Sequence, residues 1–219
     1  MRNLNRRSLL ATLGATGAGG ALESLARAAS DRRFPSVDSA ARERIRRRYF
    51  PDLTLITHEG RQVRFYEDLI KDKIVTLNFM YADCEGICPA VTSNLTKVQQ
   101  ALGRRVGRDI FMYSITLKPE HDTPKVLKDY ARMHGIKPGW SLLTGKPDDI
   151  ELLRRKLGFV DPDPEVDKDK SNHIGNVRYG NEPYQWWGAC PGQGDPGFIV
   201  ESILWVDWPK EDRGKGGKK

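Results

Sequence analysis

The stretch Lys73-Ile-Val-Thr-Leu-Asn-Phe-Met-Tyr81, continued by Ala-Asp-Cys-Glu-Gly-Ile-Cys-Pro89, decides the fold. Residues 73–81 are almost continuously apolar, as is typical of a strand buried on both faces of a sheet. Pro89 suits the first turn of a helix, and apolar side chains recur at helical spacing over residues 91–102. The stretch therefore predicts a buried strand followed directly by a helix, with Cys84 and Cys88 at the junction.

The chain beyond this stretch continues the alternation of strand and helix. A short hairpin is expected around residues 58–60, and an acidic, proline-bearing loop over residues 161–170. Further strands are expected at residues 109–117, 140–144 and 173–179, and further helices at 124–134, 147–157 and 197–206, with Thr123 and Asp195 as caps. This order predicts an α/β domain over residues 49–208 with a mainly parallel sheet and helices on both faces. Cys84 and Cys88 then lie at the carboxyl end of a central strand, where open α/β sheets place their sites.

The N-terminus has the pattern of a twin-arginine export signal over residues 1–28. Arg6 and Arg7 precede a weakly apolar, glycine-rich run, and the small residues Ala26 and Ala28 flank Arg27 as at a cleavage site. The run is shorter than the roughly 18–20 apolar residues that span a bilayer. We therefore expect export to the periplasm, with an uncleaved signal anchored in the inner membrane as the alternative.

The charge of the chain is concentrated at its ends. The four arginines and one glutamate of the signal carry +3 of the formal net charge of +7 over 219 residues, which leaves +4. No nucleic-acid-binding motif accompanies this charge, and an exported protein rarely meets nucleic acid, so we exclude that partner. An Arg-rich connector (29–48) and a basic flexible tail (209–219) are expected to be solvated, with contact to an anionic membrane surface as the other interpretation.

The cysteine pair admits three interpretations: a disulfide catalyst, a metal site or a structural bridge. A helix N-terminus favours thiolate, which both attacks disulfides and binds metals. Cys84 and Cys88 are one residue further apart than a thioredoxin-type pair, and two thiolates suit Cu(I) or another soft ion. A Cys84–Cys88 disulfide needs Cα atoms within about 7 Å. Asp83 and Glu85 are expected to be solvated acids that favour nearby cations, and Cys190 to be a small buried hydrophobic residue.

A third ligand would have to come from one of four histidines. His58 is expected to be solvated in its hairpin turn, and His134 to complement a helix dipole as a cation. His121 is expected in a loop after a strand, and His173 at the end of a loop directly before a strand. Either loop could approach the cysteines. The residues alone favour His173 over His121 without excluding the latter.

These residues together resemble the SCO/SenC family. The resemblance rests on Cys84-Glu-Gly-Ile-Cys88-Pro89, the segment Ser114-Ile-Thr-Leu-Lys-Pro-Glu-His-Asp-Thr-Pro124 with Val126-Leu-Lys-Asp-Tyr130, then Leu143-Thr-Gly145 and His173. It covers residues 53–208 and implies a thioredoxin-like fold, with a central mixed sheet flanked by helices and an added N-terminal hairpin. Lys118 is a departure, because many relatives have aspartate at this position.

The resemblance also implies a function. Cys84, Cys88 and His173 would bind copper, as Cu(I) or Cu(II), and Cys84 and Cys88 would also form a disulfide. The protein would be a metallochaperone for the binuclear copper centre of cytochrome c oxidase, with the copper-accepting subunit of that or a similar copper enzyme as partner. The alternative is a thiol-disulfide oxidoreductase in which Cys84 and Cys88 are a redox pair and no copper is carried. A peroxidase is disfavoured, since residues 80–83 lack the Pro and Thr expected before a peroxidatic cysteine.

Overall fold

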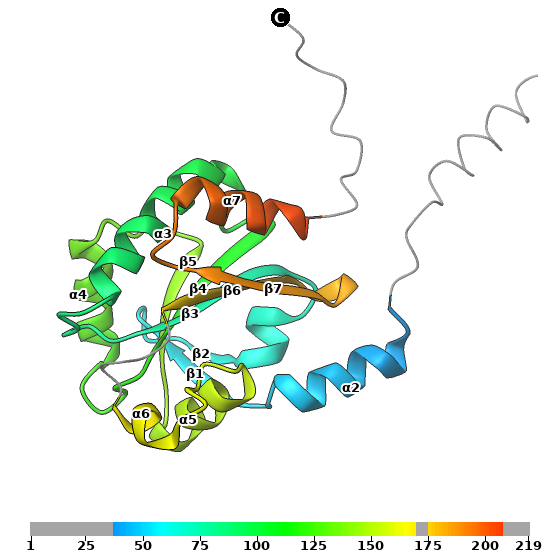
Figure 1. The fold of residues 1–219 in the computed structure, drawn as a ribbon, viewed down its shortest axis with the longest axis horizontal. Helices are drawn as coiled ribbons and strands as arrows, with labels where there is room; N and C mark the ends of the chain where they lie inside the picture. Colours follow the sequence, from blue (N-terminus) through cyan, green and yellow to red (C-terminus); the bar gives the residue numbers. More distant parts are fainter. Residues whose placement is uncertain (1–36, 170–174, 208–219) are drawn as a thin grey trace, which may run out of the picture. The chain divides into compact units, whose positions relative to one another are not determined.

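A single mixed sheet dominates the computed structural model, which describes residues 37–169 and 175–207 (Figure 1). The described strands run in the spatial order β2-β1-β5-β4-β3-β6-β7. Their bounds are β1 Thr54–Thr57, β2 Gln62–Arg64, β3 Ile74–Met80, β4 Ile110–Thr116, β5 Trp140–Thr144, β6 Asn176–Asn181 and β7 Trp186–Pro191. The export signal, the basic tail and His173 lie outside the described residues.

The centre of the sheet is parallel and its flanks are antiparallel. β4 pairs in parallel with both β3 and β5, whereas β6 runs antiparallel to β3 and β1 antiparallel to β5. The prediction of a mainly parallel sheet is therefore wrong outside these three strands, and the mixed sheet implied by the resemblance is confirmed. The predicted hairpin is also confirmed, with Leu55 opposite Val63 in the β1–β2 pair.

Helices cover both faces of this sheet, as expected. Figure 1 shows α3, α4 and α7 on one side and α2, α5 and α6 on the other. Their bounds are α2 Ser39–Tyr49, α3 Cys88–Leu102, α4 Pro124–Met133, α5 Pro147–Lys156, α6 Pro164–Lys168 and α7 Pro196–Trp205, with a π-helical turn η1 Phe65–Ile70 and 3-10 turns η2 Gly103–Arg105 and η4 Glu182–Tyr184. None of the helices in the described part of the chain combines the length and apolar character needed to span a bilayer.

The predicted helix caps are present. The Thr123 side chain accepts a hydrogen bond from the Val126 backbone N–H at 3.4 Å, and Asp195 accepts one from Phe198 at 3.1 Å. Both helices then continue with proline, whose missing N–H costs nothing at this position. Local sequence therefore fixes where α4 and α7 begin.

The three central strands share a buried polar link as well as apolar packing. Their side chains are almost all buried, and Leu77, Ile115 and Leu142 are at most 1% exposed. Trp140 donates its indole N–H to Ser114 Oγ at 2.9 Å, and Ser114 donates to Asn78 Oδ1 at 2.7 Å. Because each of these buried polar groups has a partner, the link ties β3, β4 and β5 together without the cost of an unsatisfied group.

Helix α2 replaces part of the expected solvated connector. Asp38 caps it by accepting from the Ala41 N–H at 3.2 Å, but α2 has no buried residue. Arg42 attaches it to the domain through Glu182, whose side chain is fully buried; Arg42 Nε donates to Glu182 Oε1 at 2.7 Å. An ion pair between residues far apart in the sequence therefore anchors this helix. Such a contact gives no hydrophobic periodicity from which the helix could be predicted.

The acidic loop and the segment after β6 also differ from expectation. Residues 164–168 form the short helix α6, and Asp167 binds the buried guanidinium of Arg154 through two hydrogen bonds of 2.6 Å. The aromatic segment at Trp186–Pro191 forms strand β7, which pairs with β6 along its length and was not predicted.

Candidate metal centre

The two cysteines lie at the junction of β3 and α3, as predicted. Cys88 is the first residue of α3, and Cys84 is in the short loop that follows β3. Both side chains are buried, 7% and 1% exposed respectively. The loop turns back on itself, since the Cys84 N–H donates to the Tyr81 carbonyl at 3.3 Å. The disulfide between them stays a prediction.

The two sulfur atoms are chemically unequal. Burial alone would raise the pKa of Cys84, but hydrogen bonds from the Cys88 thiol and backbone, the Tyr81 hydroxyl and the Gly86 N–H lower it below the usual value. Burial raises the pKa of Cys88 to about 12, and its hydrogen bond to Cys84 adds to the increase. Cys84 is therefore the more acidic of the two thiols and the better placed to act as the attacking group.

Two neighbouring thiols, one of them with a lowered pKa, fit a soft metal ion. Their sulfurs are within hydrogen-bonding contact, so one ion could contact both once the thiols are deprotonated. The same pair also fits thiol–disulfide exchange, with Cys84 as the attacking group.

Asp122 supports the cysteine loop and was not singled out from the sequence. Its side chain is only 2% exposed, and its Oδ2 accepts from the Ala82 N–H at 3.0 Å and from the Thr116 hydroxyl at 2.5 Å. Burial raises the pKa of Asp122 against the opposing effect of these bonds. Asp122 thus holds the chain two residues before Cys84 against the end of β4. Its place directly before the Thr123 cap was the only signal in the sequence.

Lys118 brings a positive charge to the mouth of the site. Its Nζ lies 3.0 Å from Asp83 Oδ1 and 4.0 Å from the centroid of the Tyr81 ring. Asp83 is thus an exposed acid, as expected, but one that is paired; Glu85 is exposed too. This chain thus has a cation held over the ring of the tyrosine whose hydroxyl bonds to Cys84.

Two histidines differ from their predicted state. His58 is not solvated: its side chain is 13% exposed, and its Nδ1 accepts from the Leu142 N–H at 3.1 Å. His134 does end α4, but its ring stacks on Tyr130 with centroids 4.1 Å apart. Burial lowers the pKa of both imidazoles and so disfavours their charged forms, including the cation expected of His134 at the helix end.

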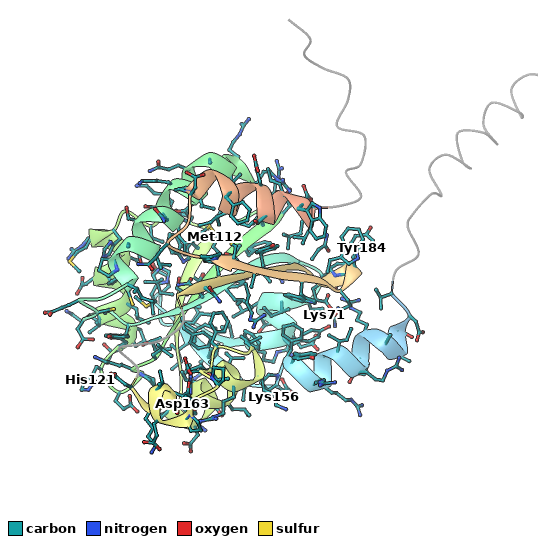
Figure 2. All side chains as sticks on the ribbon, viewed as in Figure 1. Lys71, Met112, His121, Lys156, Asp163 and Tyr184 are labelled. Carbon is teal, nitrogen blue, oxygen red and sulfur yellow. The ribbon has the colours of Figure 1, made fainter. Side chains whose placement is uncertain are left out.

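The remaining candidates are less constrained. Figure 2 shows His121 on the outside of the domain, where it is exposed. Cys190 is buried, 3% exposed, and bonds to Ser202, in line with the prediction of a small hydrophobic residue. Within residues 37–169 and 175–207, no three Cys, His, Asp or Glu side chains gather into a metal site. Of the three predicted ligands, the described residues include Cys84 and Cys88. His173 is not among the described residues.

The mixed sheet flanked by helices, with a cysteine pair at a strand–helix junction, defines a protein with a thioredoxin-like fold. The SCO1/SenC family model matches residues 41–206, and the chain belongs to the SCO1/SenC family.

Individual relatives agree with this assignment. The chain is 30% identical over 93 residues to the SCO1 protein homolog of Bacillus subtilis, an alignment that covers 42% of this chain and 47% of the relative. The chain thus spans about half the length of this curated relative. Yeast Sco1 with copper bound superposes with a TM-score of 0.56 at 23% identity, over 74% of this chain and 99% of Sco1. BsSco is described as a member of a family of cytochrome c oxidase assembly proteins and as having a disulfide switch. It superposes with a TM-score of 0.58 at 23% identity, over 72% of this chain and 92% of BsSco.

Proposed function

We propose that the protein is an exported copper-binding metallochaperone that assists assembly of the binuclear copper centre of cytochrome c oxidase. Its copper ligands are Cys84, Cys88 and His173, and its partner is the copper-accepting subunit of that oxidase or of a similar copper enzyme. The observation that carries the proposal is the Cys84–Cys88 pair at the end of β3, whose thiols are in hydrogen-bonding contact, with the pKa of Cys84 lowered and that of Cys88 raised. Membership of the family supports copper as the ion, because relatives in it are described with copper bound.

The position of Gly175 supports His173 as the third ligand. A Cβ atom built on Gly175 would lie 2.7 Å from Ile87 Cδ1, so this glycine packs directly against the residue before Cys88. The Gly175 carbonyl also accepts from the Gly192 N–H at 2.8 Å, which fixes the start of β6 there. Two residues of extended chain span at most about 7 Å. The proposal of His173 as the third ligand thus rests on its place in the sequence, two residues before Gly175.

A three-coordinate site of this kind suits delivery. Two thiolates and a neutral imidazole bind Cu(I) and leave it open to attack by an acceptor's ligands. Oxidation of Cys84 and Cys88 to a disulfide would remove two ligands along with two electrons and two protons. Copper loading and the redox state of the pair are then linked, and the disulfide is the state that cannot bind.

A second candidate function rests on the inequality of the thiols. The lowered pKa of Cys84 beside the raised pKa of Cys88 is the arrangement of an attacking and a resolving thiol. Cys84 would attack an acceptor disulfide, and Cys88 would then displace the mixed disulfide. The acceptor gains two thiols while the pair becomes a disulfide, and His173 is not required. This thiol-disulfide oxidoreductase would prepare a copper acceptor without carrying copper.

The domain organisation completes the proposal. Residues 1–28 are the twin-arginine signal that takes the chain to the periplasm, residues 49–208 the functional domain, and residues 209–219 a basic tail. The basic ends would bring the domain close to an anionic membrane surface, where the oxidase acceptor is found. Retention of an uncleaved signal would have the same effect.

Anaerobic Cu(I) titration of the reduced full chain, in competition with a chelator, separates the two functions. Changing a residue that only hydrogen-bonds to a metal ligand lowers metal affinity about 10–100-fold, so loss of a ligand itself in Cys84→Ser, Cys88→Ser or His173→Ala should cost at least that much. His121→Ala and Cys190→Ser are matched controls that should bind as the wild type does. Unchanged Cu(I) affinity in His173→Ala, together with copper-independent reduction of an acceptor disulfide, would favour the oxidoreductase instead.

A further inference from the structure

A cavity of about 730 Å³ lies between α2, the end of α5 and the face of the sheet that they cover. Its apolar wall comes from Leu77 on β3, Leu157 after α5, Phe50 after α2 and Trp187 on β7. Its volume falls within the range of about 300–1,000 Å³ that is typical of small-molecule sites. The cysteine pair does not line it, so the cavity is separate from the proposed copper site.

Four cations and no carboxylate line the same cavity. Arg44 and Arg48 come from α2, Lys156 from the end of α5 and Arg178 from β6. Figure 2 shows Lys156 between α5 and α2. An apolar wall beside basic side chains is complementary to a molecule that is both apolar and negatively charged.

The pairing of the arginines on α2 differs between its faces. Arg42 pairs with Glu182 and Asp72, and Arg46 and Arg47 both pair with Glu43. Arg44 and Arg48 line the cavity and form no ion pair with any residue in the described part of the chain.

The same contrast holds on α5. Arg154 and Arg155 pair with Glu151 and Asp167. The next residue, Lys156, lines the cavity and has no carboxylate partner within residues 37–169 and 175–207. On both helices, the cations left without a carboxylate are those at the cavity.

Arg178 is built into the wall of the cavity. It lies opposite Leu77 in the β3–β6 pair, so both side chains are on the same face of the sheet. Its guanidinium lies 5.4 Å from the centroid of the Phe159 ring and donates to the Gly158 carbonyl at 3.1 Å. Gly158 has φ +69°, and a Cβ atom there would be 2.7 Å from Arg178 Nη2, so the backbone leaves room for this side chain. Burial lowers the pKa of Arg178, and no described carboxylate offsets that cost.

The aromatic side of the wall is equally fixed. Trp187 lies flat on Gly180, where a Cβ atom would come within 2.0 Å of the indole ring. Its ring also packs on Phe50 with centroids 4.9 Å apart. The cavity therefore has a preformed apolar wall and needs no large rearrangement to accept a ligand.

We propose that this cavity binds an amphipathic organic anion, with its acidic head between the four cations and its apolar body against Leu77, Leu157 and Trp187. The planar guanidiniums of Arg44, Arg48 and Arg178 suit a carboxylate, sulfonate or phosphate head, which they can bind through paired hydrogen bonds. The ligand is either a free single-chain acid or one drawn from a membrane.

Fluorescence titration of the full chain with 8-anilinonaphthalene-1-sulfonate, itself an amphipathic anion, tests the proposal. We expect saturable binding that dodecyl phosphate displaces and that neither inorganic phosphate nor uncharged dodecanol displaces. Arg44→Gln/Arg48→Gln should weaken binding about tenfold or more, since charge-assisted hydrogen bonds are lost. Arg47→Gln and Arg155→Gln remove equally exposed charges on the same two helices away from the cavity, and should leave binding unchanged.

Three results would overturn the proposal: no saturable binding, equal weakening by the control variants, or displacement by dodecanol as effective as by dodecyl phosphate. Arg178→Gln is the second probe, checked for folding by circular dichroism; the exposed Arg44 and Arg48 keep the test open if that variant does not fold. Phosphatidylglycerol vesicles separate the two sources. If Arg44→Gln/Arg48→Gln weakens binding of the protein to these vesicles and Arg47→Gln does not, uptake of the ligand from a membrane is supported. If both variants weaken vesicle binding equally, the cavity is not the site.

Discussion

Replacing Arg42 with alanine should destabilise the protein far more than any other single arginine change on α2. Glu182 is fully buried, and Arg42 is its only cationic partner within residues 37–169 and 175–207. Removing one partner of a buried ion pair costs about 3–5 kcal/mol, because the other charge stays buried. The hydrogen bonds to Glu182 from the Tyr66 hydroxyl, at 2.7 Å, and the Asp72 N–H, at 2.8 Å, remain. We therefore expect the lower end, about 3 kcal/mol.

Thermal and urea unfolding at pH 7, followed by circular dichroism, would measure this loss. For a domain of 150–250 residues, 1 kcal/mol shifts the melting temperature by about 2–4 °C, so the midpoint should fall by about 6–12 °C. Arg47→Ala is the matched control: its side chain is 76% exposed and its pair with Glu43 lies on the surface, so it should cost about 0–1 kcal/mol. If the free energies of unfolding of the two variants differ by less than about 1 kcal/mol, the Arg42–Glu182 contact does not anchor α2.

The pH dependence of the same pair has a definite sign. Burial alone would raise the pKa of Glu182, but the hydrogen bonds from Arg42, Asp72 and Tyr66 lower it below the usual value. A carboxylate with a lowered folded pKa stabilises the protein fully above its unfolded pKa of about 4.3. That contribution is lost as the pH falls through the folded pKa. The stability difference between the wild type and Arg42→Ala should thus narrow below about pH 4; a constant difference would contradict the assignment of the charge.

Two further predictions concern Asp122 and the partly buried histidines His58 and His134. Asp122→Ala removes the acceptor of the hydrogen bonds from Ala82 and Thr116, and should lower the free energy of unfolding in urea by about 1–3 kcal/mol. Asp122→Asn keeps an acceptor oxygen and should lower it less. Equal losses of stability in the two variants would contradict this role of Asp122. His58 and His134 have lowered pKa values, so the stability they give is complete above their unfolded pKa of about 6.5 and is lost as the pH falls through the folded values. Between pH 7.5 and 5.5, the melting temperature of the wild type should fall more than that of His58→Gln/His134→Gln, and parallel curves would refute the assignment.

The sequence predicts the parts of this fold whose signal is local. The continuous apolar run of β3 and the helical spacing after Pro89 correspond to a buried strand and a packed helix. The caps at Thr123 and Asp195 are equally local, because the capping bond joins residues three apart. Such features predict where elements begin and what type they are.

The elements that the sequence analysis missed depend on distant partners. α2 is attached through Glu182, 140 residues away from Arg42 in the chain, and α6 through Arg154. Charged residues of this kind have the same pattern as a solvated surface until the fold brings them together. β7 was missed for a related reason: its glycine and exposed tryptophan break the alternation that predicts a strand, and only its pairing with β6 defines it.

The candidate site divides in the same way. The spacing and helix-end position of Cys84 and Cys88 predicted a reactive pair. Their inequality could not be predicted, because it arises from the burial of Cys88 and from the Tyr81 hydroxyl. The lowered pKa of His58 likewise could not be predicted, because it arises from the burial of the side chain after folding.

The most direct test of the copper site is X-ray absorption spectroscopy at the copper edge on the Cu(I)-loaded full chain. The ligand set Cys84, Cys88 and His173 predicts two sulfur scatterers and one imidazole nitrogen around each copper. In His173→Ala the imidazole signal should disappear while both sulfurs remain. An unchanged imidazole signal in that variant, or a wild-type spectrum with fewer than two sulfurs, would contradict the proposed metal centre.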